Sequence, residues 1–164
     1  MTRPPHILLV EAPYYAHIAD LLRRGAERAL AAVGATHEIV SVPGAFEIPA
    51  AIGLAARATN RFDGFVALGC VIRGETTHYD HICAECARGL QDLAVRESVA
   101  IGFGVLTVEN EAQALARASA GQRDKGGEAV RACLALVDLK RRVIGEEHEH
   151  ADGAAAWQSA GGRG

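Results

Sequence analysis

The chain has 164 residues, 49% of them hydrophobic, and a formal net charge of −3. This size suits one compact domain, and the lack of a long Lys/Arg run excludes the basic surface by which proteins bind nucleic acid or anionic membranes. The apolar runs are far shorter than a membrane span and no signal-peptide pattern is present. We therefore expect a cytoplasmic protein that binds small molecules, with its four cysteines as free thiols.

Short apolar segments rich in β-branched residues alternate with segments of helical period along the chain. The expected strands are 7–10, 38–42, 64–72 and 99–108, and the expected helices lie at about 18–33, 46–58, 78–95, 112–118 and 127–142. This alternation predicts an α/β fold, with a four-stranded parallel sheet covered by helices on both faces as a three-layer αβα sandwich. In such sheets ligands bind at the carboxyl ends of the strands.

The segment 145–164 differs in composition from the rest of the chain. It begins with a run of Glu and His and continues with Ala, Gly and Ser. These residues bury too little apolar surface to offset the entropy of ordering. We therefore expect the domain to comprise residues 1–144, followed by a disordered tail.

The connection after the third strand carries the first candidate site. Thr77 and Asp80 have the spacing of a capping box, which places His78 in the first turn of a helix. There the positive end of the helix dipole disfavours imidazolium, so His78 is a candidate proton acceptor. Free backbone N–H groups, the small Gly74 and the hydroxyl of Thr76 suit a phosphate. The alternative is a capped helix with a surface histidine that binds nothing.

A metal or redox site in the same segment is the next possibility to weigh. His78, His81, Cys83 and Cys86 have spacings that resemble those of zinc ligands. At about 100° per residue of helix, these four side chains point in different directions and cannot converge on one ion. The two cysteines also lie inside the expected helix rather than at its start, where a thiolate would be stabilised. We therefore expect neither a metal site nor a redox pair.

Other candidate residues also follow strands or join helices. Glu47 begins the second helix, where it could bind a hydroxyl or amine of a substrate or could cap the helix. Tyr14 and Tyr15 follow the first strand and could stack on a planar ring or pack as part of an ordinary loop. Arg117 and Lys125 flank the connection between the last two helices, where each could bind phosphate or be a solvated surface charge.

Four motifs, taken in order, resemble one enzyme family. They are Pro-Gly-Ala-Phe-Glu-Ile-Pro at 43–49, Gly-Cys-Val-Ile-Arg-Gly-Glu-Thr-Thr-His-Tyr-Asp at 69–80, Leu-Thr-Val-Glu-Asn at 106–110 and Asp-Lys-Gly-Gly at 124–127. From about residue 7 to about residue 142 the chain is similar to the 6,7-dimethyl-8-ribityllumazine synthases. The resemblance implies a flavodoxin-like fold and the joining of 5-amino-6-(ribitylamino)uracil to 3,4-dihydroxy-2-butanone 4-phosphate in riboflavin biosynthesis, without cofactor or metal.

The resemblance also implies a role for each matching position. It makes His78 the proton-transfer residue, and it places the active sites between subunits of a pentamer or of a multiple of pentamers, with Phe103 lent by a neighbouring subunit. The residues that it implies for the pyrimidine and its ribityl chain are Tyr14, Ala45, Glu47, Val71, Ile72 and Phe103. Those that it implies for the butanone phosphate are Gly74, Glu75, Thr76, Arg117 and Lys125.

The sequence departs from the family pattern at two places, and two other functions fit the same fold. Ala12-Pro13 precedes Tyr14 where the family often has a polar residue such as arginine, and Cys70 replaces a commoner threonine. A protein of this fold could bind a riboflavin-like ligand without turnover, or could serve as a structural shell. A flavodoxin proper is disfavoured, because segment 11–15 lacks the run of Ser, Thr and Gly that holds a flavin phosphate.

Overall fold

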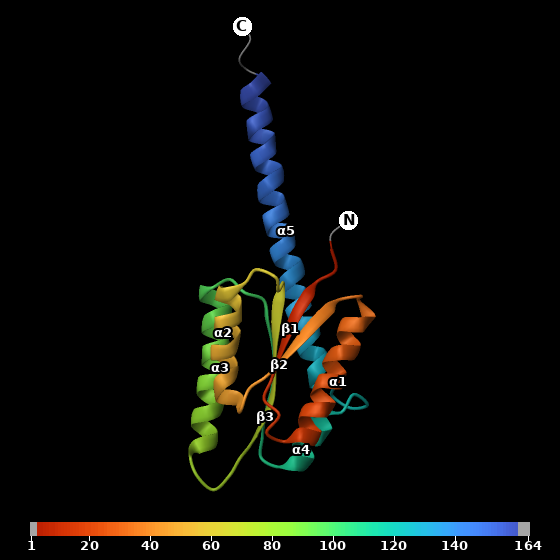
Figure 1. Cartoon of the computed structure of the whole chain (residues 1–164), viewed down its shortest axis with the longest axis vertical. Coiled ribbons are helices and arrows are strands. Elements are labelled where there is room, and N and C mark those ends of the chain that lie inside the picture. Colours follow the sequence, from red (N-terminus) through yellow and green to blue (C-terminus); the bar gives the residue numbers. More distant parts are fainter. Residues whose placement is uncertain (1–2, 161–164) are drawn as a thin grey trace.

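A parallel sheet of four strands forms the centre of the protein, which we describe from a computed structural model (Figure 1). The structure describes residues 3–160, with side chains for residues 3–144. All strand pairs are parallel and the spatial order is β2-β1-β3-β4, which confirms the predicted sheet. The strands are β1 (His6–Glu11), β2 (Thr36–Ser41), β3 (Gly64–Ile72) and β4 (Ile101–Val108).

Helices cover both faces of the sheet, as predicted for a three-layer αβα sandwich of flavodoxin-like type (Figure 1). One face carries α2 (Ile48–Ala58), which follows the short 3₁₀ helix η1 (Ala45–Glu47), and α3 (His78–Arg96). The other face carries α1 (Ala16–Ala32), α4 (Glu111–Ala118) and α5 (Lys125–Ala160). The disorder expected for the tail at 145–164 stays a prediction, because the structure describes no side chains in that segment.

The core consists of two apolar layers, one on each side of β1 and β3. Ile7 and Leu9 face α1 and α5, whereas Leu8 and Val10 face α2 and α3. All four side chains are buried, which explains why these central strands read as continuous apolar runs. Burying one such side chain contributes about 1.5–3 kcal/mol. In the described part of the chain, no helix is long and apolar enough to cross a membrane.

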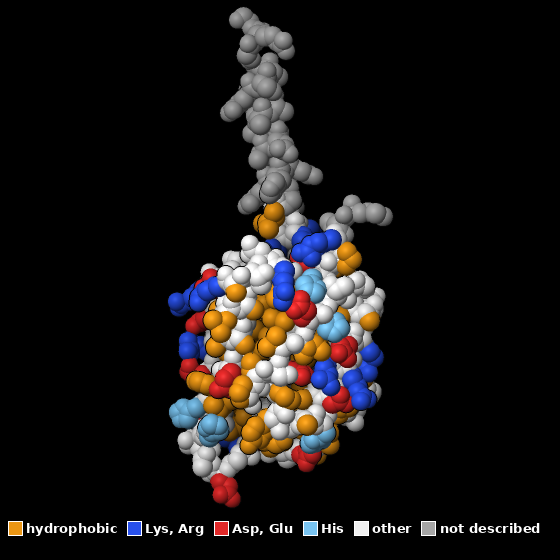
Figure 2. All heavy atoms as spheres, in the orientation of Figure 1, with side chains coloured by type: hydrophobic (Ala, Val, Ile, Leu, Met, Phe, Trp, Pro, Cys, Tyr) orange, Lys and Arg blue, Asp and Glu red, His pale blue; other side chains and the backbone are white. Residues whose placement is uncertain are grey.

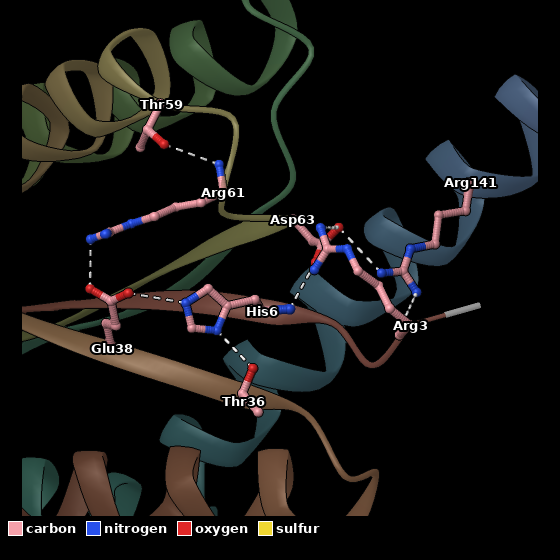
Figure 3. A network of polar contacts seen from close by, with 8 residues as sticks. All are labelled: Arg3, His6, Thr36, Glu38, Thr59, Arg61, Asp63 and Arg141. Atoms are coloured by element: carbon pink, nitrogen blue, oxygen red, sulfur yellow. Dashed lines mark hydrogen bonds and ion pairs between the residues drawn. The ribbon is translucent and has the colours of Figure 1, made fainter. Parts of the chain in front are cut away.

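A network of polar contacts joins the elements at the amino ends of the strands (Figure 3). The carboxylate of Asp63 accepts a hydrogen bond from the backbone N–H of His6 at 2.8 Å and forms ion pairs with Arg3 and Arg141 at 3.0 and 3.2 Å. The His6 ring lies 3.1 Å from Glu38. These bonds tie the starts of β1, β2 and β3 to α5. The amino edge is therefore fixed by contacts that leave the opposite, carboxyl edge available for a ligand.

Helix α5 packs directly on β4 at Gly102, where the backbones of the two elements approach closely. A Cβ built at Gly102 would overlap the carbonyl group of Ala129 in α5 and would come within 3.1 Å of the Cβ of Cys133. Backbone atoms cannot move aside as the tip of a flexible side chain can. Only glycine therefore fits this position of the strand.

Replacing Gly102 by alanine is expected to lower the stability of the fold by about 2 kcal/mol or more, because the extra methyl group forces β4 and α5 apart. Gly121 provides a matched control, since a Cβ built there meets no atom within 4 Å. Urea unfolding at one fixed protein concentration measures both variants. A Gly102→Ala protein as stable as Gly121→Ala would contradict the close packing.

Candidate active site

A pocket of about 430 Å³ opens at the carboxyl edge of the sheet. Its walls come from the connections after β1 and β2, from the end of β3 and from the start of α3. The structure thus brings together side chains that lie in separate motifs of the sequence, as expected for the ligand site of a parallel sheet. The residues lining it that the sequence predicted are Tyr14, Ala45, Glu47, Val71, Ile72 and His78.

Tyr14 presents an aromatic surface to this pocket. The backbone N–H of Ala12 donates to Leu68 at 2.9 Å, so the pairing of β1 with β3 continues one residue past the strand before Pro13. Tyr14 is 74% exposed and meets Tyr15 edge to face, with 5.0 Å between ring centroids. Tyr15, in contrast, packs against the core. Simple packing therefore accounts for Tyr15, whereas the open ring of Tyr14 is free to stack on a planar group.

Glu47 holds its carboxylate over the turn that follows β2. Glu47 is the N-cap residue of α2, but its side chain makes no capping hydrogen bond, so the capping alternative is wrong. A Cβ built at Gly44 would lie 3.1 Å from the Oε2 atom of Glu47. The small Gly44 therefore leaves room for this carboxylate, which lines the pocket as an acceptor for hydroxyl or amine groups.

His78 is the first residue of α3, as predicted, but the predicted capping box is absent. Thr77 has φ −73° and ψ 0°, and its side chain makes no cap hydrogen bond. An N-cap side chain reaches the helix from an extended backbone, which Thr77 does not have. The hydroxyl of Thr76 takes the place of the missing cap, since it accepts a hydrogen bond from the backbone N–H of His78 at 3.3 Å. The carboxylate of Asp80, the other member of the predicted box, binds Arg73 at 3.1 Å instead. The exposed His78 ring lines the pocket.

The turn 74–77, which we call the phosphate turn, contains Gly74, Glu75 and Thr76 and lies outside the walls of this pocket. All four residues are exposed, and a Cβ built at Gly74 meets nothing within 4 Å. Among the residues that the structure describes, no protein group accepts from the backbone N–H groups of this turn. Open space and free donors at the start of a helix suit an anion.

Positive charge for such an anion is missing from the surrounding sequence. Arg73 is the only Lys or Arg between Arg61 and Arg88. Its guanidinium is already bound to Glu109 at 3.0 Å and to Asp80 at 3.1 Å. A phosphate at the turn therefore needs a cation from another part of the fold.

Two predicted cations and Phe103 lie in a second, separate pocket of about 190 Å³. Edge strand β4 forms its wall, and none of its lining residues belongs to the first pocket. Arg117 is half-buried and donates to the backbone oxygen of Gln113 at 3.1 Å, and within residues 3–144 it has no carboxylate partner. Lys125 pairs with Glu128 at 2.6 Å. The predicted site residues of one chain thus lie in two separate pockets and in the turn between β3 and α3, and Arg117 is the cation without a carboxylate partner among the described residues.

The four cysteines are free, and three of them are buried. Burial raises the pKa of the Cys70 and Cys86 thiols to about 11 and that of Cys133 to about 12. Burial also raises the pKa of the Cys83 thiol. Thiols with raised pKa values stay protonated near neutral pH and are poor nucleophiles. Within the described part of the chain, no group of three or more His, Cys, Asp or Glu side chains could hold a metal ion.

Several residues in the wall of the first pocket are not among the predicted site residues. They are Pro43, Gly44, Phe46, Cys70 and Ile82, together with Tyr15, which the sequence left open as a stacking or packing residue. Ile82 lies one helical turn after His78, so helical period could have indicated it. For Cys70 no signal existed, because a strand residue that alternates into the core looks the same whether or not it reaches the edge of a pocket.

Comparison with known proteins agrees with this geometry. The family model described as 6,7-dimethyl-8-ribityllumazine synthase matches residues 4–141. The 6,7-dimethyl-8-ribityllumazine synthase 1 of Rhizobium meliloti (strain 1021) is 54% identical over 149 residues, covering 88% of this chain and 97% of the relative. The synthase of Agrobacterium fabrum (strain C58 / ATCC 33970) is 52% identical, covering 86% and 98%, and that of Sphingopyxis alaskensis (strain DSM 13593 / LMG 18877 / RB2256) is 55% identical, covering 84% and 96%. The chain therefore belongs to the 6,7-dimethyl-8-ribityllumazine synthase family.

Proposed function

We propose that the protein condenses 5-amino-6-(ribitylamino)uracil with 3,4-dihydroxy-2-butanone 4-phosphate to 6,7-dimethyl-8-ribityllumazine. Membership of the family makes it a transferase of riboflavin biosynthesis. The observation that carries the assignment to this site is the pocket that joins Tyr14, Glu47 and His78 at one edge of the sheet. We place the activity in the cytoplasm, which the free state of all four cysteines supports.

The pyrimidine would occupy the first pocket. Its ring would stack on the open face of Tyr14, and Val71 and Ile72 would contact it at the end of β3. The ribityl hydroxyls would donate to the carboxylate of Glu47, beside the small Ala45. This placement points the reactive amine toward the start of α3, where His78 and the phosphate turn lie.

The chemistry requires proton transfers and loss of phosphate rather than an enzyme nucleophile. The pyrimidine amine attacks the ketone and water leaves to form an imine. His78 would accept a proton from the carbon between the imine and the phosphate-bearing carbon as inorganic phosphate departs. Tautomerisation gives a new carbonyl, which the ribityl-bearing nitrogen attacks, and a second loss of water closes the ring. Positioning of the two substrates supplies much of the rate enhancement in such condensations.

The butanone phosphate would bind where two subunits meet. Gly74, Glu75 and Thr76 of one subunit would surround its phosphate, with Arg117 and Lys125 of a neighbour supplying positive charge. Two observations support this arrangement: Arg73, the only Lys or Arg between Arg61 and Arg88, is already bound to two carboxylates, and Arg117 has no carboxylate partner in the described part of the chain. Phe103, which is 48% exposed in the second pocket, would contact the pyrimidine from the neighbouring subunit.

A ring of five subunits, alone or in multiples, is the assembly that we propose. Figure 2 shows hydrophobic side chains gathered over the middle of one face of the protein. Exposed large hydrophobic residues include Val40 in edge strand β2, Phe46 before α2 and Leu54 in α2. A hollow of about 350 Å³ lies between α3 and Phe103, beside β4 at the other edge of the sheet. Apolar surface of this extent is typical of a subunit interface.

Purified protein given both substrates is expected to release one phosphate for each lumazine formed. Phosphate release and the absorbance of the lumazine measure this directly. Binding of the pyrimidine without product at high enzyme concentration would instead identify a binding protein of the same fold and would overturn the proposal.

Changing His78 to alanine is expected to lower kcat by roughly 100-fold, the lower end of the range typical of general acid–base catalysis, because water in an open pocket can carry some of the protons. The nearby His81→Ala protein is the control, since His81 does not line the pocket. Steady-state kinetics and light scattering test rate and assembly together. A His78→Ala enzyme that turns over at the parent rate would exclude the proton-transfer role.

Changing Arg117 to alanine is expected to raise KM for the butanone phosphate by about tenfold or more while KM for the pyrimidine changes little, because only the first substrate carries a phosphate. Arg123→Ala is a matched control, because Arg123 is an exposed arginine in the connection between α4 and α5. Equal loss of affinity for both substrates would contradict the assignment.

The same variants test the shared site. In mixed rings of His78→Ala and Arg117→Ala subunits, about a quarter of the sites recover both wild-type residues if the residues come from adjacent subunits. With equal amounts of the two subunits and butanone phosphate well below its KM, activity should then be roughly two- to threefold that of Arg117→Ala, the more active variant under these conditions. No recovery in rings shown to be mixed would place both residues in the site of one subunit.

A further inference from the structure

Arg73 joins both ends of the phosphate turn to the end of the neighbouring strand. Its Nε atom donates to the two carboxylate oxygens of Glu109 at 3.2 and 3.0 Å. One terminal nitrogen donates to Asp80 at 3.1 Å, and the guanidinium carbon lies 4.2 Å from the centroid of the Tyr79 ring. The backbone N–H of Arg73 donates to Val108 at 2.9 Å. One side chain therefore connects the end of β3, the first turn of α3 and the segment that follows β4.

The partners of Arg73 are themselves held in place. The backbone N–H of Glu109 donates to the side chain of Gln113 at 2.9 Å, and Asn110 caps α4 by accepting from the N–H of Gln113 at 2.9 Å. Burial raises the pKa of the Tyr79 phenol, whose hydrogen bond with Thr107 in β4 opposes that shift. Glu109 and Tyr79 are thus anchored to α4 and β4, and they give the guanidinium a defined position.

The phosphate turn has few contacts of its own. Among the described residues, its hydrogen bonds run only to the start of α3: the Thr76 hydroxyl accepts from the N–H of His78 at 3.3 Å, and the Thr77 carbonyl accepts from the N–H groups of Asp80 and His81 at 3.1 and 3.4 Å. The predicted capping box, which would have fixed the helix start locally, is absent. Residues 74–77 are exposed throughout. The conformation of this turn therefore depends on how its two ends are held.

We infer that Arg73 is a positioning residue for the butanone phosphate, which holds the phosphate turn in the conformation that presents its N–H groups and the Thr76 hydroxyl. This inference rests on the proposed function. Arg73 acts through the turn rather than on the phosphate, because two carboxylates and an aromatic ring already occupy its guanidinium. Lysine cannot replace it fully, since a single ammonium group cannot reproduce the planar fork that bonds both carboxylates.

Arg73→Ala and Glu109→Ala are the two informative variants. Each is expected to raise KM for the butanone phosphate roughly tenfold, with KM for the pyrimidine nearly unchanged, and the double variant should lose little more than either single one. Arg73→Lys should fall between the parent and Arg73→Ala. Arg88→Ala is the control, because among residues 3–144 the Arg88 side chain bonds only to Glu85 and Asp92 within α3.

Glu109→Ala separates positioning from direct binding. If Arg73 contacted the phosphate itself, removal of Glu109 would release the guanidinium and strengthen binding of the substrate and of inorganic phosphate. Positioning predicts the opposite result, weaker binding in both variants. Stronger binding in Glu109→Ala, or equal changes in both KM values, would overturn the inference.

Hydrogen–deuterium exchange provides a measurement that does not depend on turnover. In the free protein, the hydrogen-bonded amides of His78, Asp80 and His81, whose acceptors lie in the phosphate turn, should exchange several-fold faster in Arg73→Ala than in the parent, while Arg88→Ala leaves them unchanged. Unchanged exchange in Arg73→Ala would overturn the inference even if the parent is active. An inactive parent with faster exchange in the variant would instead refute the proposed function and retain the role of Arg73 in holding the turn.

Discussion

Parallel pairing of the four strands is the constraint on which the site depends. The register pairs Glu11 with Ser41 and Leu68, and Ile72 with Val108, so all strands end at the same edge. The connections that follow are brought together although they are distant in the sequence. A slip of one residue in β3 would exchange the faces of Cys70 and Val71 and change the wall of the pocket. Apolar burial on both faces of β1 and β3 fixes that register.

The two edges of the sheet serve different purposes. At the amino edge, Asp63 and Arg141 satisfy one another and help to hold the fold. At the carboxyl edge, polar groups are left incompletely satisfied: Arg117 has no carboxylate partner in the described part of the chain, and the buried Oε2 atom of Glu11 has no hydrogen bond. Buried groups without partners cost stability, and proteins tolerate them mainly where a ligand binds. The amino edge therefore helps to hold the fold, whereas the carboxyl edge carries the first pocket and the incompletely satisfied groups.

Periodicity and motif order were enough to predict the fold and much of the first pocket. Alternation of short apolar strands with helical stripes located the four strands and helices α1 to α4 near their observed bounds, whereas α5 extends to Ala160, beyond the expected end at about 142. The motifs selected Glu47 and His78, and Tyr14 was selected because it follows the first strand. The capping box failed because sequence spacing does not reveal the backbone angles of Thr77. The bond between Arg73 and Glu109 was not predictable, because 36 residues separate the pair and only the three-dimensional arrangement of β3 and β4 brings them together.

The same arrangement explains why Arg73, the cation next to the phosphate turn, would not bind the phosphate itself. Arg73 lies next to the turn, but Glu109 and Asp80 neutralise its charge, so the turn of an isolated subunit offers dipoles and hydroxyls without net positive charge. In the proposed ring the missing charge comes from Arg117 of a neighbour. Phosphate binding would then require assembly. Each subunit carries both the N–H donors of the turn and the unpaired Arg117, but at two different places, so only two adjacent subunits bring them together. Arg73 would hold the conformation of the turn, and Arg117 at the subunit interface would supply the positive charge that binds the phosphate.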